Sequence, residues 1–557
     1  MKIKHIDIQN FRKLKSCRVD FHERETIFVG ANNSGKTSAM NALMLFLKDK
    51  KLDTKDFTLS LWKEIEKIGD GWLDAANNKT QPDLSMERWR DILPQLDVWL
   101  EVGTGEFHYV SRIIPTLDWS GGSLGVRLRY QPKSEKAIEA LYKDYTTAFL
   151  AAQNAKSEPN KGLKLWPCTM LDFLERRLHS HFQVCAYILD PNQLNATHNG
   201  VVAPQPLPPN SPVLDFDPFD GIIKIDIINA QRGFSNTNTE GFEQKNLSSQ
   251  LRKYFSAHLD PAVLPEATDI DALQAIENAK GAFDAKLKDS FKGPLSELEL
   301  LRYPGFGNPT ITISTDVNPI DGIKHDSAVL FDVLGDKNNP HSGPRLPEHY
   351  NGLGYQNLIS MVFKLIGFRD EWMHVGKKGK QLEATSQGFE FEPLHLVMIE
   401  EPEAHLHAQV QQVFIREAYR VLRFHPHLGD KKKFTTQLVV STHSSHVAHE
   451  VDFVCLRYFR RKPSAQAGEV PTSIVVNLCP VHSAMRSNPL AIRYLKATHC
   501  DIFLWRPLIL VEGSWRSACW FLTLFWAKSI QAMNIISDPE TGGSHAHRLQ
   551  PLLEQLD

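Results

Sequence analysis

The chain has 557 residues, 42% of them hydrophobic, and a formal net charge of −2. This length predicts about two or three domains with large cores, and the balanced charge excludes a globally basic nucleic-acid binder. The seven cysteines form no CxxC pair, and no charge-free apolar stretch reaches the length of a membrane span, so a disulfide framework, a structural zinc site and a transmembrane helix are not expected. We expect a cytoplasmic protein.

Strands and helices alternate in the first half of the chain. Residues 2–29 have the pattern of short strands, and a glycine loop at 30–35 leads into a helix that begins near Lys36. The pattern further predicts strands at 97–102 and 125–130, two helical pieces over 135–181, a proline-rich linker or long loop at 202–218, and a strand at 222–229.

The second half begins with helical patterns at 243–258 and 270–300, which are typical of an arm or a dimerisation insert. The elements expected after them are a β segment at 309–315, a helix near 355–366, an exposed segment at 369–391, a strand at 394–399, a helix at 406–424 and a strand at 436–441. Apolar strands, a glycine loop and late strands of this kind indicate an α/β domain with a parallel sheet, divided by a long insertion.

The glycine loop carries the clearest chemical motif. Residues 30–37 (GANNSGKT) match GxxxxGK[ST] in full. In such a loop backbone N–H groups surround phosphates, Lys36 reaches the β- and γ-phosphates, and the Thr37 hydroxyl binds Mg²⁺. An ordinary glycine turn is the alternative, but the strand before it and the amphipathic helix after it favour a phosphate-binding loop (P-loop).

Two acids end a later apolar strand. In LHLVMIEEP at 394–402, Glu400 is placed to hold Mg²⁺ and Glu401 to polarise an attacking water. A strand running into a charged loop is the alternative. The next apolar strand ends at His443, which could reach a γ-phosphate from the same sheet edge or could simply cap a loop. Glycines at 352–354 precede another helix, so this segment is either an anion site or a plain turn.

Together these motifs resemble the OLD-family ATP-dependent nucleases, which belong with RecF- and SMC-type ATPases. The resemblance rests on NFR at 10–12, GANNSGKTS at 30–38, GLGYQNLI at 352–359, IEEPEAHLH at 399–407 and VVSTHSSHV at 439–447. It implies an ABC-type P-loop ATPase domain split by a helical dimerisation insertion. It also implies a homodimer or higher homo-oligomer that acts on DNA, with a possible partner protein and no membrane.

The resemblance further implies the residues that bind Mg²⁺ and ATP. Glu401, His443 and Glu400 would be catalytic, with His443 as the switch histidine and 402–407 as the D-loop. The signature segment would act on ATP held by the other subunit. Gln131 and Gln231 are both open candidates for the Q-loop glutamine. Nucleotide contacts would come from Gly30, Asn32, Asn33, Ser34, Gly35, Lys36, Thr37, Ser38, from Arg12 on the γ-phosphate side, and from Gly352, Gly354 and Asn357 of the signature.

The C-terminal segment resembles the start of a Toprim domain, the nuclease half of OLD proteins. The strand at 507–511 ends in Glu512, which would bind a divalent metal. No Asp-x-Asp follows it, and a tryptophan-rich stretch at 515–539 departs from the family pattern. We therefore expect a truncated or disrupted Toprim domain. The expected organisation is 1–150 and 331–500 for the ATPase domain, 151–330 for the insertion, and 501–557 for the partial Toprim domain.

Two functions follow from this sequence. The first is the ATP-binding and ATP-hydrolysing component of an OLD-family DNA endonuclease, in phage defence or DNA maintenance. The second is an ATPase sensor or clamp on DNA or a partner, without nuclease activity of its own, which the missing Asp-x-Asp favours. A kinase or GTPase is a third possibility, against which the paired Glu400–Glu401 and the glycines at 352–354 argue.

Overall fold

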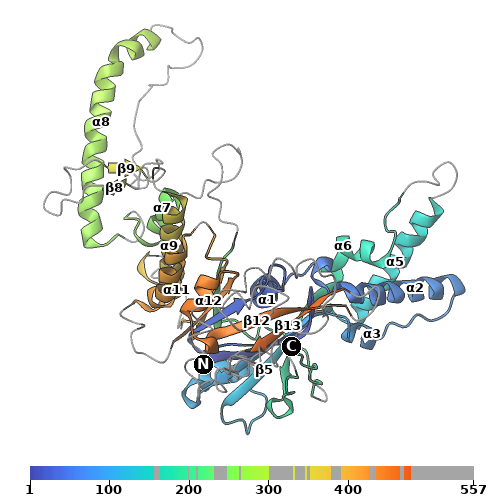
Figure 1. Cartoon of the computed structure of the whole chain (residues 1–557). Coiled ribbons are helices and arrows are strands. Elements are labelled where there is room, and N and C mark those ends of the chain that lie inside the picture. Colours follow the sequence, from blue (N-terminus) through green and yellow to red (C-terminus); the bar gives the residue numbers. More distant parts are fainter. Residues whose placement is uncertain are drawn as a thin grey trace, which may run out of the picture.

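The fold is taken from a computed structural model of the chain, shown in Figure 1. It describes residues 1–155, 164–198, 200–208, 211–230, 247–261, 265–299, 330–332, 345–347, 350, 352–377, 391–404, 406–425, 428, 434–464 and 470–477. The predicted β segment at 309–315 and the expected Toprim segment at 501–557 lie outside these ranges. Within them, no helix is long and apolar enough to cross a membrane.

The first sheet is antiparallel, in the order β2-β1-β4-β5-β6. Alternation along its strands buries one face in an apolar core, where Ile6, Leu96 and Val98 are fully buried. The opposite face carries bidentate ion pairs, such as Arg127 to Asp97 with both N–O distances 2.7 Å. The strands are β1 (Lys2–Phe11), β2 (Leu14–Asp20), β4 (Gln95–Val102), β5 (Gly122–Pro132) and β6 (Phe182–Leu189).

The proline-rich segment is a long loop that packs against this polar face. Val202 is buried, and its carbonyl accepts a hydrogen bond of 2.8 Å from the Gln9 side chain on β1. Leu214 forms a bridge with Ala186 on β6. The loop therefore shields buried charges of the sheet from solvent, and it does not act as a spacer between domains.

The second sheet has the order β13-β12-β3-β11-β10-β7 and is parallel except for the β12–β13 pair. Both of its faces are covered, because neighbouring residues of one strand enter two different cores. This explains why its strands are nearly continuous apolar runs. Its strands are β3 (Glu25–Val29), β7 (Ile223–Ile228), β10 (Leu394–Glu400), β11 (Thr435–Thr442), β12 (Leu456–Lys462) and β13 (Thr472–Asn477).

Helices cover both faces of the second sheet. On the side of the first sheet, the shared core includes α1 (Lys36–Met44), which a π-helical turn extends over Leu45–Asp49. The same core continues into α2 (Trp62–Asn78), α5 (Glu135–Asn154) and α6 (Met170–His181), which pack on one another and beside β5 and β6 of the first sheet. The far face is covered by α9 (Leu353–Trp372), α11 (Ala408–Arg423) and α12 (Ser445–Glu450). The short helices α3 (Glu87–Arg90) and α4 (Phe107–Val110) flank β4 in the sequence.

The predicted insertion at 151–330 differs from the structure in its first part. Strand β6 pairs with β5, and β7 pairs with β10 along six residue pairs, so residues 182–228 contribute strands to both sheets. The reason is their apolar content: Ile225 and Ile228 complete the two cores at the edge of the second sheet. The helical arm begins only after β7.

The arm consists of α7 (Leu247–His258) and the long α8 (Ala267–Glu299), beside the small β8 (Leu330–Asp332) and β9 (Arg345–Pro347) pair. Figure 1 shows α8 extending away from the sheets, while α7 lies along α9. Lys377 connects the arm to the segment after α9, because its ammonium donates to Asp269 and to the carbonyl of Asp260, both at 2.6 Å.

The segment predicted as exposed at 369–391 is partly buried. Its first residues finish α9, where Asp370 is buried and accepts a hydrogen bond of 2.7 Å from Tyr254 of α7. Lys377 is also buried. The charged residues indicated exposure, but Asp370 and Lys377 are buried because each has a partner on the arm. The KKGK stretch itself reaches beyond 377 into residues that the structure does not describe.

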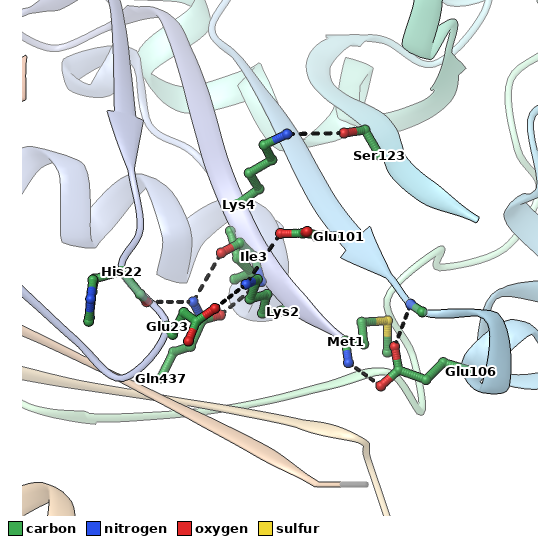
Figure 2. A network of polar contacts seen from close by, with 11 residues as sticks. Met1, Lys2, Ile3, Lys4, His22, Glu23, Glu101, Glu106, Ser123 and Gln437 are labelled. Atoms are coloured by element: carbon green, nitrogen blue, oxygen red, sulfur yellow. Dashed lines mark hydrogen bonds and ion pairs between the residues drawn. The ribbon is translucent and has the colours of Figure 1, made fainter. Parts of the chain in front are cut away.

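One glutamine connects the two sheets. Gln437 of β11 is buried, and its side-chain amide both accepts from the backbone N–H of Ile3 (2.8 Å) and donates to the carbonyl of Ile3 (3.0 Å). It also donates to the carbonyl of His22 at 3.0 Å. Figure 2 shows this junction beside the N-terminal strand, where Met1 forms an ion pair with Glu106.

Candidate nucleotide-binding site

Strand register brings the separated motifs to one edge of the second sheet. In the pairing of β3 with β11, Val29 lies opposite Thr442, and in the pairing of β11 with β10, Ser441 lies opposite Glu400. The next residues along these parallel strands are Gly30, His443 and Glu401. Residues far apart in the sequence therefore meet where α/β sheets bind ligands, at the carboxyl ends of the strands.

The P-loop has the backbone that phosphate binding needs. Gly30 and Gly35 have φ values of 147° and 103°, and a Cβ on Gly30 would lie 2.4 Å from the carbonyl of Phe459. Helix α1 starts after Gly35 without a side-chain cap and without an acidic residue in its first turn. The buried Ser34 hydroxyl has no hydrogen-bond partner among the described residues. The free N–H groups at the start of α1 and the buried Ser34 hydroxyl are hydrogen-bond donors that suit the oxygens of a polyphosphate.

Lys36 lies inside this loop. Its ammonium donates to the carbonyls of Gly30 at 2.7 Å and Ala31 at 3.1 Å, and only 4% of the residue is exposed. Burial lowers the pKa of Lys36 to about 8, although the negative charges of Glu401 and Glu403 oppose this shift. The lysine therefore lies close to the acids that follow β10.

The two acids after β10 have different environments. Glu400 is buried, which raises the pKa of its carboxyl, and it accepts a hydrogen bond of 3.4 Å from the backbone N–H of Ala230. Glu401 has a left-handed backbone with φ 44°, which is strained for a residue with a side chain. Its carboxylate lies 2.8 Å from Nε2 of His443. The strained turn thus separates the two carboxylates and directs the second one to the histidine.

A third acid, Glu403, was not identified from the sequence. Its carboxylate accepts a hydrogen bond of 2.7 Å from the backbone N–H of His443, and its charge acts on Lys36. The acidic run IEEPE was visible, but only the fold shows that Glu403 turns back toward the histidine. It connects the segment that follows β10 to His443.

Arg12 lies near Glu400. Its Nε donates to Asp56 at 2.8 Å, and its positive charge acts to lower the pKa of Glu400, so it is near the end of β10. Gln131 lies elsewhere, because its side chain donates to the Tyr187 hydroxyl on the polar face of the first sheet at 2.8 Å. It is therefore not placed to serve the P-loop. Gln231 lies outside the described residues.

The signature-like segment forms the start of α9. Gly352 is the N-cap residue and is exposed, and Gly354 lies in the first turn. Asn357 is buried, and its side chain donates to the carbonyl of Ala404 at 2.7 Å. Leu353 is 52% exposed. The segment is thus joined through Asn357 to the residues after β10, and it presents Gly352 and the apolar Leu353 at the surface.

A magnesium ion at this site would need a hydroxyl and phosphate oxygens as ligands in addition to a carboxylate. Among the described residues, no group of three or more His, Cys, Asp or Glu side chains is arranged to hold a metal. Thr37 is exposed at the start of α1, and Glu400 ends β10. A hydroxyl, a carboxylate and phosphate oxygens match the oxygen-rich, partly hydrated coordination of Mg²⁺. Glu512 lies outside the described residues.

The fold and the site define a P-loop ATPase of the α/β class, as the sequence predicted. The chain belongs to the AAA ATPase domain family, whose model matches residues 1–161 and 217–448. Family membership supports ATP binding and ATPase activity. The matched range continues through the helical arm and ends before β12 and β13.

Curated proteins are similar to this chain over short stretches, among them an endonuclease and a RecF protein. The chain is 31% identical over 103 residues to the endonuclease GajA of Bacillus cereus (strain HuB5-5), covering 18% of this chain and 13% of that protein. It is 33% identical over 78 residues to the DNA replication and repair protein RecF of Lactococcus lactis subsp. lactis (strain IL1403), covering 14% of this chain and 22% of that protein. The matches thus span less than a quarter of each relative.

Solved structures with overall similarity have low scores. The SMC head domain from Thermotoga maritima is 11% identical with a TM-score of 0.29, covering 86% of this chain and 99% of that one. The structure of Stu0660 of Streptococcus thermophilus is 9% identical with a TM-score of 0.32, covering 99% of both chains. At such scores the similarity carries no argument, and the fold class rests on the sheet topology and the family match.

Proposed function

We propose that this protein binds Mg-ATP at Gly30–Ser38 and hydrolyses it with Glu401 as the general base. The observation that carries the proposal is the convergence of Lys36, Glu401 and His443 at one sheet edge. Lys36 would neutralise the β- and γ-phosphates, and Thr37 and Glu400 would hold the metal. A bound Mg²⁺ would supply charge neutralisation at the β- and γ-phosphate oxygens.

Glu401 and His443 divide the catalytic work. The carboxylate of Glu401 would orient the attacking water and accept its proton, which is worth about 10²–10⁴-fold in rate for a well-placed base. His443 holds that carboxylate at 2.8 Å and itself is held through its backbone by Glu403. These two contacts support a role for His443 as the link between the γ-phosphate and the proposed D-loop at 402–407.

The test compares two substitutions in the site with one outside it. Glu401→Gln should bind ATP with nearly normal affinity and lose turnover by about 10²–10⁴-fold, because the amide cannot accept a proton. Lys36→Ala should weaken binding itself. Glu417→Gln, the same chemical change at an ion pair with Arg420 on the surface of α11, should leave both unchanged. Normal turnover in Glu401→Gln would refute the assignment.

We further propose that two copies of the chain share their ATP sites. Gly352 is exposed and Gly354 is half-buried beside the exposed Leu353 and Tyr355, and the arm helix α8 exposes Ile270 and Phe283. An exposed signature that is fixed to its own D-loop through Asn357 suits contact with ATP on a second subunit. The oligomer would be a homodimer or a higher homo-oligomer.

The wider role that we propose is the ATPase part of an OLD-family DNA endonuclease, in phage defence or DNA maintenance. The short similarity to endonuclease GajA and to RecF supports a role on DNA. A divalent metal at Glu512 would serve the Toprim chemistry. The second candidate is an ATPase sensor or clamp that acts on DNA or a partner protein, which the lack of an Asp-x-Asp within residues 513–557 favours.

A further inference from the structure

The hairpin of β12 and β13 forms the wall behind the P-loop. Strand β12 pairs with β3, and the carbonyl of Phe459 lies so close to Gly30 that a side chain there would collide with it. On β13, Ser473 is buried, and its hydroxyl would lie 3.4 Å from a Cβ on Gly35. The hairpin thus lies against both glycines of the GxxxxGK motif, Gly30 and Gly35.

Arg461, at the end of β12, binds the loop between these two glycines. Its Nε donates to the carbonyl of Asn33 at 3.3 Å, and its Nη2 donates to the carbonyl of Asn32. Lys13 donates to the same Asn33 carbonyl at 3.4 Å. Arg461 and Lys13 thus bind the carbonyls of Asn32 and Asn33, whereas Lys36 binds those of Gly30 and Ala31, so that donors from outside the motif hold the second half of the loop in one conformation.

Backbone strain explains why such a clamp is useful. Asn33 has φ 62°, in the left-handed region that residues with a side chain occupy at a cost. A planar guanidinium that binds two successive carbonyls fixes both peptide planes at once, which a lysine cannot do. The clamp therefore holds the turn in its strained form before any ligand arrives.

The same residues form a cluster of positive charge. The pKa of Lys36 is lowered by burial and also by the charge of Arg461, while that of Lys13 is lowered by burial and by Arg461. Three cations that repel one another around this loop are stabilised by a polyanion. A nucleoside triphosphate is the ligand that matches this charge and this loop.

We propose that Arg461 is a positioning residue of the ATP site, and that it raises ATP affinity by holding the P-loop through the carbonyls of Asn32 and Asn33. The β12–β13 hairpin, which lies beyond the matched range of the ATPase family, is then a working part of the site in this chain. This inference rests on the proposed binding of ATP at the P-loop.

The experiment measures ATP affinity and steady-state turnover of the full chain with Arg461→Gln, Arg461→Lys and Lys462→Gln. Lys462 is the exposed neighbour on the same strand, so its substitution removes one charge without touching the clamp. We expect Arg461→Gln to raise the Kd and KM for ATP about tenfold or more, with kcat at saturating ATP nearly unchanged. Arg461→Lys should recover part of the affinity, and Lys462→Gln should match the wild type.

The outcomes separate the two proposals. If the wild type and Lys462→Gln bind ATP and Arg461→Gln binds it within twofold of them, the role of Arg461 is refuted while ATP binding stands. An equal loss of affinity in Arg461→Gln and Lys462→Gln would also refute the clamp, since charge alone would explain it. If the wild type itself binds no ATP, the proposed function fails. The melting temperature of each nucleotide-free variant should stay near that of the wild type, and a large drop in Arg461→Gln alone would assign the residue to folding instead.

Discussion

The buried position of Lys36 predicts that ATP affinity falls at alkaline pH. With a pKa of about 8, about nine-tenths of the lysine is protonated at pH 7 and about one-tenth at pH 9. If only the charged form binds the triphosphate well, the Kd for ATP should rise about tenfold between these values. The last ionisation of a phosphate monoester has a pKa of about 6, so the charge of the ligand changes little between pH 7 and pH 9.

Protein stability should change in the opposite direction. The pKa of Lys36 in the folded protein lies below its ordinary value of 10.5, so the unfolded chain binds more protons between pH 8 and pH 10.5. This group therefore stabilises the nucleotide-free protein as the pH rises through that window. Weaker ATP binding at pH 9 would then not reflect unfolding caused by Lys36.

The assay is equilibrium binding of a fluorescent ATP analogue at pH 7, 8 and 9 with constant Mg²⁺ and salt. Lys36→Arg keeps a positive charge throughout, so any affinity that it retains should not depend on pH in this range. A wild-type Kd that stays within twofold from pH 7 to pH 9 would show that Lys36 keeps its proton, and the reasoning from its burial would be wrong.

Three further predictions concern assembly, DNA and stability. Mixing inactive Lys36→Ala with inactive Gly354→Asp should restore some ATPase activity if subunits exchange, because one hybrid site is intact; no recovery, with a monomeric mass at all concentrations, would contradict shared sites. This polypeptide should hydrolyse ATP without cutting supercoiled or linear DNA in Mg²⁺ or Mn²⁺, and cleavage that disappears in Glu512→Ala would favour the nuclease over the sensor or clamp. Gln437→Leu should lower the free energy of unfolding by about 2–3 kcal/mol, because it leaves the buried backbone groups of Ile3 without partners; a denaturant midpoint equal to that of the wild type would show that water replaces the amide.

Local sequence determined the elements of the ATP site. The GANNSGKT loop has glycine at positions of positive φ, and the short apolar runs before Gly30, Glu400 and His443 indicate buried strands. Each of these signals comes from residues that are adjacent in the chain, so the motifs and most strands and helices could be predicted without a structure.

Three features depended on contacts between distant segments. The role of Glu403 depends on a turn that brings it back to His443, and that of Arg461 on the pairing of β12 with β3. The burial of Lys377 depends on partners more than a hundred residues earlier in the chain. The sequence around a charged residue does not show whether its side chain faces water or a buried ion-pair partner.

The sequence by itself determined that this protein has a phosphate-binding loop, a pair of acids and a late histidine, because these signals are local. Only the tertiary structure decided that β3, β11 and β10 are neighbours in register, so that the three motifs meet at one edge. It also decided that β6 and β7 belong to the two sheets and that the β12–β13 hairpin lies against the P-loop. Strand order is set by how all the apolar faces are buried together, and no single segment of the chain carries that information.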